Sequence, residues 1–206
     1  ATSYVYIDDG TITSVYGGSN SADIQKTNVF INGGKITSVY GGNNTSGEVA
    51  SSTSITINNG NIASLFGGGN YAGNDYNTNI VVNNGNITTL YGGGDNGDIA
   101  NADIKLCGGT FASLIYGGGN AGNAKDINLL FDGATSINDI YGGGNKGSSN
   151  NVTLEMKSGS TMGNVYGGGY QGYTKETKLI LSGATVKKDI YGGGNAGDTD
   201  STTINI

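Results

Sequence analysis

Apolar and polar residues alternate in short segments that recur along the whole chain. Each segment places two aliphatic side chains two positions apart, and a period of two buries one face of a β-strand. The segments are too short and too rich in β-branched residues for helices. We therefore expect one strand per repeat, with its inward face formed by Val5/Ile7, Val29/Ile31, Ile55/Ile57, Ile80/Val82, Ile104/Leu106, Leu129/Phe131, Leu154/Met156, Leu179/Leu181 and Ile204/Ile206.

A second apolar pair follows each strand, after a turn rich in Asn, Asp and Gly, where positive φ is cheap. In the first four repeats these pairs are Ile12/Val15, Ile36/Val39, Ile62/Leu65 and Ile87/Leu90. An aromatic residue and glycines come next. The aromatic residues are spaced by 24, 26 and then five times 25 residues, and they are Tyr16, Tyr40, Phe66, Tyr91, Tyr116, Tyr141, Tyr166 and Tyr191.

This period predicts the architecture, because one such repeat has no buried core and must stack on its neighbours. We expect an all-β, single-domain parallel β-helix (β-solenoid) of about eight coils of about 25 residues, over residues 1–206. Residues 202–206 open a further coil. We therefore also expect the chain to be a fragment of a longer protein.

Asn-Gly pairs leave one alternative open. They occur at residues 32–33, 59–60, 84–85 and 96–97, and Asn-Gly is a strong signal for a two-residue hairpin. Each repeat could then be an antiparallel hairpin in an array or a propeller-like ring. The segment after the turn is about five residues long and is followed by glycines, which suits a coil that turns a corner better than a hairpin arm.

The composition narrows the chemistry. The chain has no His, Arg, Trp or Pro and a single Cys107, so an imidazole base, a guanidinium clamp and a cysteine pair are absent. Hydrophobic residues make up 35% and are regularly spaced, which argues against a disordered Gly-rich linker. A net charge of −6 with scattered lysines gives nucleic acid no basic surface. No apolar run is long enough to span a bilayer.

The aromatic column is the first candidate site. Seven tyrosines and one phenylalanine in register would form a ladder on which sugar rings stack, with hydroxyls and amides at its rim. The same residues, Tyr16, Tyr40, Phe66, Tyr91, Tyr116, Tyr141, Tyr166 and Tyr191, would instead pack structurally if the turn rotated them inward. Phe66 shows that the hydroxyl is dispensable in at least one coil.

The residue after the glycines forms a second column, with Asn at 44, 70, 120, 145 and 195 and Asp95 in one coil. Stacked amides can hydrogen-bond along such a column, so we expect turn support. Acidic residues gather weakly nearby, at Asp95/Asp98 and Asp198/Asp200. They offer oxygen ligands for calcium, although they do not recur from coil to coil; otherwise no cofactor is expected. Cys107 is expected to be a small buried or half-buried residue.

An outward column lies between the two buried positions of each strand, at Tyr6, Phe30, Thr56, Val81, Lys105, Leu130, Glu155 and Ile180. Five of these eight side chains are apolar, which predicts either an ordinary sheet surface or lateral association of copies through Tyr6, Phe30, Val81, Leu130 and Ile180. Thr and Ser do not alternate regularly on this face, which weakens an ice-binding interpretation.

The repeat resembles the β-strand repeat regions of large bacterial surface and adhesin-like proteins. The resemblance rests on the signature [VIL]-[YF]-Gly-Gly-[GN]-Asn, unbroken at residues 39–44, 65–70, 115–120, 140–145 and 190–195, with departures at residues 17–19, at Asp95 and at Tyr170. It implies a right-handed parallel β-helix at the cell surface or outside the cell. It carries over no catalytic residue, since none matches.

We therefore expect a non-enzymatic extracellular module for adhesion or structural presentation, with glycans or host cell-surface ligands as partners and with neither nucleic acid nor membrane insertion. Two alternatives stay open: a polysaccharide lyase or hydrolase on a β-helix, and a self-assembling, ice-binding-like solenoid. A lyase needs a base and a cation beside its uronate, and the lysines fall at different places in different coils.

Overall fold

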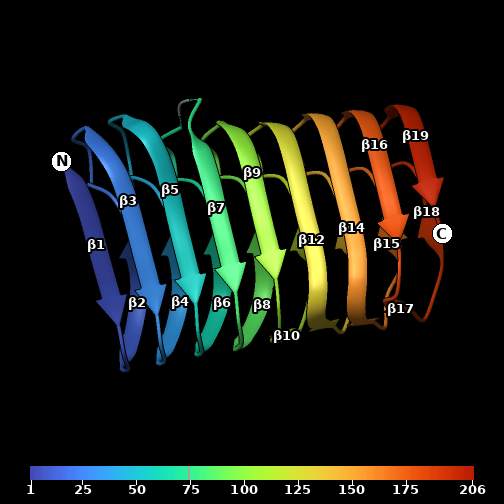
Figure 1. Ribbon diagram of the computed structural model, residues 1–206. Helices are drawn as coiled ribbons and strands as arrows, with labels where there is room; N and C mark the ends of the chain where they lie inside the picture. Colours follow the sequence, from blue (N-terminus) through green and yellow to red (C-terminus); the bar gives the residue numbers. More distant parts are fainter. Residues whose placement is uncertain (74) are drawn as a thin grey trace.

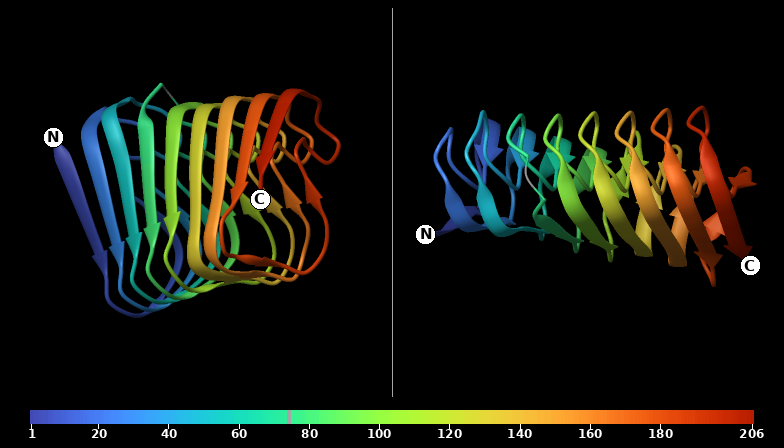
Figure 2. Two further views of the ribbon diagram at one scale, coloured as in Figure 1. Left: turned by 45° about the vertical axis from the view of Figure 1, so that its right-hand side comes forward. Right: turned by 90° about the horizontal axis from the view of Figure 1, so that it is seen from above.

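A computed structural model describes residues 1–73 and 75–206, and it is a parallel β-solenoid of about eight coils. The coils stack side by side into a rod, with the two termini at opposite ends (Figures 1 and 2). Every pairing between the strands of the described residues is parallel. The hairpin alternative is therefore wrong, because the two strands of a hairpin pair antiparallel.

One wall of the rod consists of the strands that carry the alternating pairs. Each strand pairs in register with its counterpart one coil away, as Val29 does with Ile55 and Ile55 with Ile80. The strands of this first wall are β1 (Thr2–Ile7), β3 (Ile24–Ile31), β5 (Val49–Ile57), β7 (Asn77–Val82), β9 (Ile99–Leu106), β12 (Ala124–Ser136), β14 (Ser149–Thr161), β16 (Thr174–Leu181) and β19 (Thr199–Asn205).

The second wall carries the aromatic residues. In the first four coils it has one strand per coil: β2 (Thr11–Tyr16), β4 (Lys35–Tyr40), β6 (Asn61–Phe66) and β8 (Asn86–Tyr91). From the next coil on, the wall contains two-residue strands: β10 (Thr110–Phe111), β11 (Ile115–Tyr116), β13 (Ile140–Tyr141), β15 (Val165–Tyr166), β17 (Thr185–Val186) and β18 (Ile190–Tyr191). The ends of β12 and β14 also enter this wall, where they pair with β10 and β17.

A single inserted residue explains this change. β8 pairs with both β10 and β11, with Ile87 opposite Phe111 and Leu90 opposite Ile115. The two inward residues are three positions apart in β8 and four apart in the next coil, so the ladder cannot continue without a break. The aromatic residue returns to register directly afterwards, with Tyr91 opposite Tyr116.

The core fills the space between the walls with the predicted aliphatic pairs. Val29, Ile55, Ile80 and Leu154 have no exposed surface, and the second pairs, such as Ile36/Val39, join the same core cluster. In the coil at either end of the chain, burial is lower, and Ile204 is 41% exposed. The apolar surface buried between stacked coils therefore holds the rod together.

Candidate functional site

The aromatic column is a continuous stack of rings on the second wall. Neighbouring rings from Tyr16 to Tyr191 lie 4.8–5.2 Å apart between centroids and within 15° of parallel. The strand register causes this spacing, because Tyr116 pairs directly with Tyr141 and Tyr141 with Tyr166. We call these eight side chains the aromatic ladder. The tyrosine ladder expected from the period is thus present.

The ladder forms a layer of its own, separate from the aliphatic core. In each coil the preceding residue, such as Val39, faces the core, so the aromatic residue points to the other side of the strand. Tyr116, Tyr141 and Tyr166 nevertheless form a buried cluster, packed against Leu114 and Tyr170. Tyr141 is 2% exposed, whereas the last ring, Tyr191, is 44% exposed.

This geometry limits how a sugar can meet the ladder. Each ring from Tyr40 to Tyr166 has a neighbouring ring on both faces, so stacking on a ring face has room only at the ends of the ladder. A ligand could otherwise contact only the ring edges and hydroxyl groups of the accessible members, which are Tyr16, Tyr91 and Tyr191. The hydroxyl of Tyr141 donates to Asp139 Oδ2 over 3.3 Å, and that of Tyr191 donates to Asp189 Oδ2 over 3.4 Å.

The buried phenol groups of Tyr116 and Tyr141 stay protonated over a wide pH range. Burial raises the pKa of the Tyr116 and Tyr141 hydroxyls well above the usual range, and the negative charge of Asp139 adds to the effect on Tyr141. The Asp189 carboxylate is the main cause that raises the pKa of Tyr191. A neutral phenol donates and accepts hydrogen bonds but is a weak base, so the ladder offers polar contacts rather than an activated nucleophile.

The asparagine column after the glycines is confirmed as a hydrogen-bonded ladder. Within each run of asparagines the side-chain Nδ2 donates to the Oδ1 one coil earlier, as from Asn70 to Asn44 (3.0 Å) and from Asn145 to Asn120 (2.7 Å). Asp95 accepts from Asn120 Nδ2 at 2.6 Å. A carboxylate has no proton to donate, so Asp95 begins a new run of the ladder instead of continuing the old one.

Where Tyr170 replaces the asparagine, the two ladders meet. The ring of Tyr170 packs edge-on against Tyr141, with 5.5 Å between centroids. Asn195, one coil further on, donates its Nδ2 to the hydroxyl of Tyr141 at 3.5 Å. The column after the glycines therefore lies along the aromatic ladder and helps to cover it.

A second asparagine ladder runs along the Asn-Gly turns. Asn32 Nδ2 donates to Asp8 Oδ1, Asn58 to Asn32 and Asn83 to Asn58, each over 2.8 Å. The next position is Cys107, whose backbone N–H bonds to the carbonyl of Val82. Its side chain is exposed. The expectation of a buried or half-buried cysteine is wrong, because the residue after inward Leu106 faces outward in an alternating strand.

A buried column of hydroxyl groups was not predicted from the sequence. Thr53 Oγ1 donates to the carbonyl oxygen of Gly67 across the coil at 2.7 Å, and both groups lie in the interior. The same bond joins Thr27 to Gly41 (2.6 Å), Thr78 to Gly92 (2.8 Å), Thr177 to Gly192 (2.6 Å), and Ser3 to Gly17. The signal in the sequence is Thr or Ser two positions before the first residue of the inward pair.

The four candidate calcium ligands are divided between two places. Asp95 belongs to the asparagine ladder, and Asp98 Oδ1 accepts from the backbone N–H of Asn123 at 2.7 Å. Asp198 and Asp200 lie near the C-terminus, where Asp200 Oδ2 accepts from the hydroxyl of Tyr173 at 2.6 Å. Over residues 1–73 and 75–206, no group of three or more His, Cys, Asp or Glu side chains gathers as a metal would require. Calcium binding at these residues stays a prediction.

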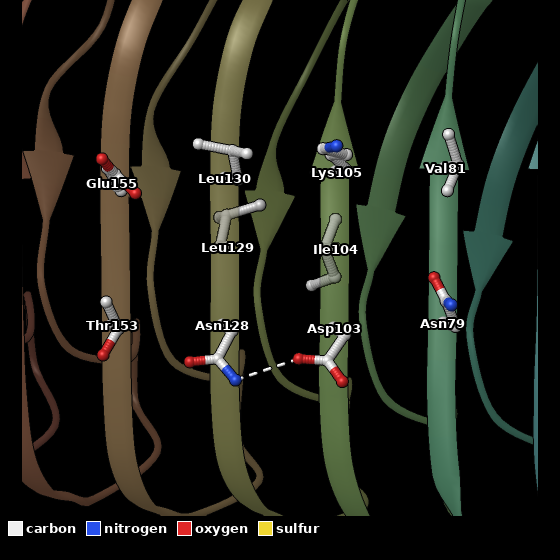
Figure 3. Close-up of a pocket in the computed structure, with 10 residues that line it drawn as sticks. All are labelled: Asn79, Val81, Asp103, Ile104, Lys105, Asn128, Leu129, Leu130, Thr153 and Glu155. Carbon is white, nitrogen blue, oxygen red and sulfur yellow. Dashed lines mark hydrogen bonds between the residues drawn. The ribbon is translucent and has the colours of Figure 1, made fainter.

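The outward column of the first wall is in register from coil to coil, as predicted. It passes from Val81 to Lys105, Leu130, Glu155 and Ile180 on strands β7 to β16. The apolar members of this stretch are half-buried and Lys105 is exposed. Beside it runs a polar column with Asn79, Asp103, Asn128 and Thr153, and Figure 3 shows both.

A shallow groove of about 420 Å³ follows these two columns across β7, β9, β12 and β14. Its polar side is stabilised by the bond from Asn128 Nδ2 to Asp103 Oδ1, at 2.9 Å (Figure 3). Its other side is lined by Val81, Lys105, Leu130 and Glu155. One side of the groove is thus apolar and charged, and the other is a row of two amides, one carboxylate and one hydroxyl.

Comparison of the chain with protein-family models, with curated proteins and with solved structures finds no match. The solenoid implied by the resemblance to adhesin-like repeat proteins is present in the fold. The part of the chain that the structure describes contains no helix of the length and hydropathy needed to cross a bilayer.

Proposed function

We propose that this chain is a non-enzymatic extracellular module for adhesion or structural presentation. The observation that carries the proposal is that the repeated side chains contact one another. Aromatic rings, amides and threonine hydroxyls each recur at one position per coil, and they stack on or hydrogen-bond mainly to other parts of the same rod. Side chains fixed by such neighbours stiffen a scaffold. A stiff rod suits holding other parts of a protein away from a surface.

The state of the ionisable groups supports a role without catalysis. Several carboxylates accept hydrogen bonds from ladder partners, as Asp8 does from Asn32 and Asp126 does from Asn151 Nδ2 at 2.6 Å. The buried phenols are held neutral, with their pKa raised by burial. General acid–base catalysis needs a group whose pKa lies near the working pH and which faces a substrate, and burial moves the pKa of these phenols away from that range.

Glycans are the ligand class that the aromatic ladder suits. Its accessible rim is formed by the half-buried Tyr16 and Tyr91 and the exposed Tyr191, whose hydroxyl donates to Asp189. Sugar hydroxyls both donate and accept hydrogen bonds. A neutral phenol can do both, and a phenol whose O–H is bonded to a carboxylate can still accept. We place the adhesive contacts at this rim rather than on the ring faces, which the stack occupies.

The test is a binding screen of the folded protein against a glycan array and insoluble polysaccharides, with and without calcium. The matched variants are Tyr91→Phe together with Tyr191→Phe, which keep both rings and remove two accessible hydroxyls, and Tyr4→Phe, whose ring is 63% exposed and outside the ladder. Binding that the double variant loses and Tyr4→Phe keeps supports adhesion at the rim.

Two other results have definite meanings. A blank screen from a protein whose circular dichroism shows folded β-structure leaves structural presentation as the function. Release of new reducing ends or unsaturated products from any polysaccharide would overturn the non-enzymatic proposal. Binding only in the presence of calcium would instead point to Asp95/Asp98 or Asp198/Asp200.

A further inference from the structure

The outward column of the first wall has an internal symmetry. Leu130 is at its centre, Lys105 lies one coil before it and Glu155 one coil after, and Val81 and Ile180 lie two coils away on either side. The segment of the column from Val81 to Ile180 is thus apolar at its centre and at its two ends, with opposite charges at equal distances from Leu130. A surface with this arrangement is complementary to a reversed copy of itself.

We propose that two copies of this chain pack face to face through this column, with their rods antiparallel and a two-fold axis along β12. Such an axis turns the face over and reverses the order of the coils, while the strand direction is kept. Leu130 then meets Leu130 of the second copy, Lys105 lies opposite its Glu155, and Val81 lies opposite its Ile180. By symmetry, the contact between Lys105 and Glu155 and the contact between Val81 and Ile180 each occur twice in the dimer.

The charges decide between this arrangement and its parallel counterpart. A two-fold axis along the rod would keep the coil order, so Lys105 would meet Lys105 and Glu155 would meet Glu155. Like charges opposed in an interface are unfavourable, and opposite charges fix the register. Only the antiparallel arrangement pairs Lys105 with Glu155 on both sides of Leu130.

The polar column beside it fits the same operation. Asp103 would lie opposite Thr153 of the second copy, Asn79 opposite its Lys178, and Asn128 opposite its own counterpart. All of these are donor–acceptor combinations. Asp126 would face its own copy, but it lies four residues from Leu130, about 13 Å along the strand, at the rim, where its Oδ1 accepts from Asn151.

The groove between the columns provides room for this contact. Sheets that pack face to face interdigitate their side chains and lie about 10 Å apart. The groove of about 420 Å³ beside Leu130, Lys105 and Glu155 (Figure 3) is where side chains of the second copy would enter. Tyr6 and Phe30, which stack on each other with 4.9 Å between centroids, lie on the same face but outside this overlap.

Charge exchange between two variants tests the proposal. Lys105→Glu and Glu155→Lys each place like charges across the interface, so each should raise the dimer dissociation constant at least about tenfold in analytical ultracentrifugation. An equal mixture should regain wild-type affinity, because the two carboxylates of one variant then face the two ammonium groups of the other. The control Lys35→Glu makes the same charge change at an exposed position of β4 and should leave the dimer intact.

Circular dichroism and unfolding curves establish that each variant is folded. Glu155 also forms an intrachain ion pair with Lys157 at 3.6 Å, so Leu130→Glu, which puts two carboxylates on the axis, serves as a second disruptive variant. A wild-type chain that is monomeric over the whole concentration series would overturn the proposal. So would a Lys105→Glu variant that associates like the wild type, or a mixture that fails to recover.

Discussion

At the scale of the residue, glycine meets two different requirements in this chain. In the Asn-Gly turns it supplies positive φ, with values of 90° at Gly34 and 117° at Gly85. The first glycine after each aromatic residue has no such angle. A Cβ on Gly117 would overlap the carbonyl oxygen of Gly142 in the next coil. Close approach of stacked backbones, and not backbone freedom, therefore explains why these glycines recur from coil to coil.

Gly117→Ala should lower the free energy of unfolding by about 2 kcal/mol or more, because a rigid carbonyl must move to admit the methyl group. The measurement is urea denaturation followed by circular dichroism. Gly193→Ala is the matched control in the same type of segment: the nearest atom to its added Cβ would be Thr199 Oγ1 at 3.4 Å, an ordinary contact. Equal effects of the two substitutions would contradict the close-approach explanation.

Thr53→Val should destabilise the fold by about 1–3 kcal/mol, because it keeps the side-chain shape and leaves the Gly67 carbonyl without its buried donor. Val152 occupies the equivalent position in a later coil, so the volume is tolerated. Thr56→Val, on the outward side of the same strand, should change the stability by less than about 0.5 kcal/mol. Chemical denaturation of both variants measures the difference, and a neutral Thr53→Val would show that the bond contributes nothing.

At the scale of the element, the side-chain ladders have a direction. Amide Nδ2 groups donate toward the preceding coil, so an aspartate can begin a run but cannot extend it, as Asp8 and Asp95 show. Cys107 ends the turn ladder after Asn83, although its backbone still bonds in register to Val82. The interruption is therefore confined to the side chain.

Cys107→Asn should repair this step, because its Nδ2 can donate to Asn83 Oδ1 as Asn83 does to Asn58. We expect a gain in stability of about 0.5–1 kcal/mol, the usual contribution of one hydrogen bond. Thermal unfolding measures it, with Cys107→Ala as the control that removes the thiol without supplying an amide. A Cys107→Asn protein no more stable than Cys107→Ala would show that ladder continuity has no energetic value at this turn.

The aromatic ladder predicts a loss of stability in alkali. Burial raises the pKa of Tyr116 and Tyr141 in the folded chain, and that of Tyr76, outside the ladder, to about 12, while unfolded tyrosine titrates near a pKa of about 10. Above about pH 10 the tyrosines of the unfolded chain lose protons that the buried tyrosines of the folded chain keep. The stability is therefore complete below about pH 10 and falls as the pH rises toward the folded values.

Urea unfolding between about pH 8 and about pH 12, the range that spans the unfolded tyrosine pKa, measures the slope of the unfolding free energy against pH. Tyr116→Phe should flatten it, since Phe66 shows that the stack accepts a phenyl ring at 4.8 Å from both neighbours. Tyr4→Phe, at an exposed position, should leave the slope as in the wild type. A slope that Tyr116→Phe does not alter would mean that the phenol of Tyr116 is not protected from ionisation.

At the scale of the whole molecule, the period of about 25 residues was enough to predict the coil stack, the strand walls and the inward pairs. The orientation of the aromatic ladder could not be predicted, because it depends on how the glycine segment and the Asn column fold back beside Tyr141. The Thr53–Gly67 bond spans 14 residues across the coil, so the recurring Thr or Ser marks its donor in the sequence, but only the closed coil shows its acceptor. The exposure of Cys107, in contrast, could have been predicted from strand alternation alone.

The central claim is that the repeated side chains are structural, so the buried part of the aromatic ladder should add to the stability that the aliphatic core gives the coil stack. The most direct measurement is the free energy of unfolding of Tyr116→Ala beside that of Tyr191→Ala. Tyr116 is 3% exposed between two rings and Tyr191 is 44% exposed with Tyr166 on one face. We predict a loss of about 3–5 kcal/mol for the first and under about 1.5 kcal/mol for the second. Similarly small losses for both, with glycan binding abolished by Tyr116→Ala, would contradict a structural ladder and make the tyrosines a binding surface.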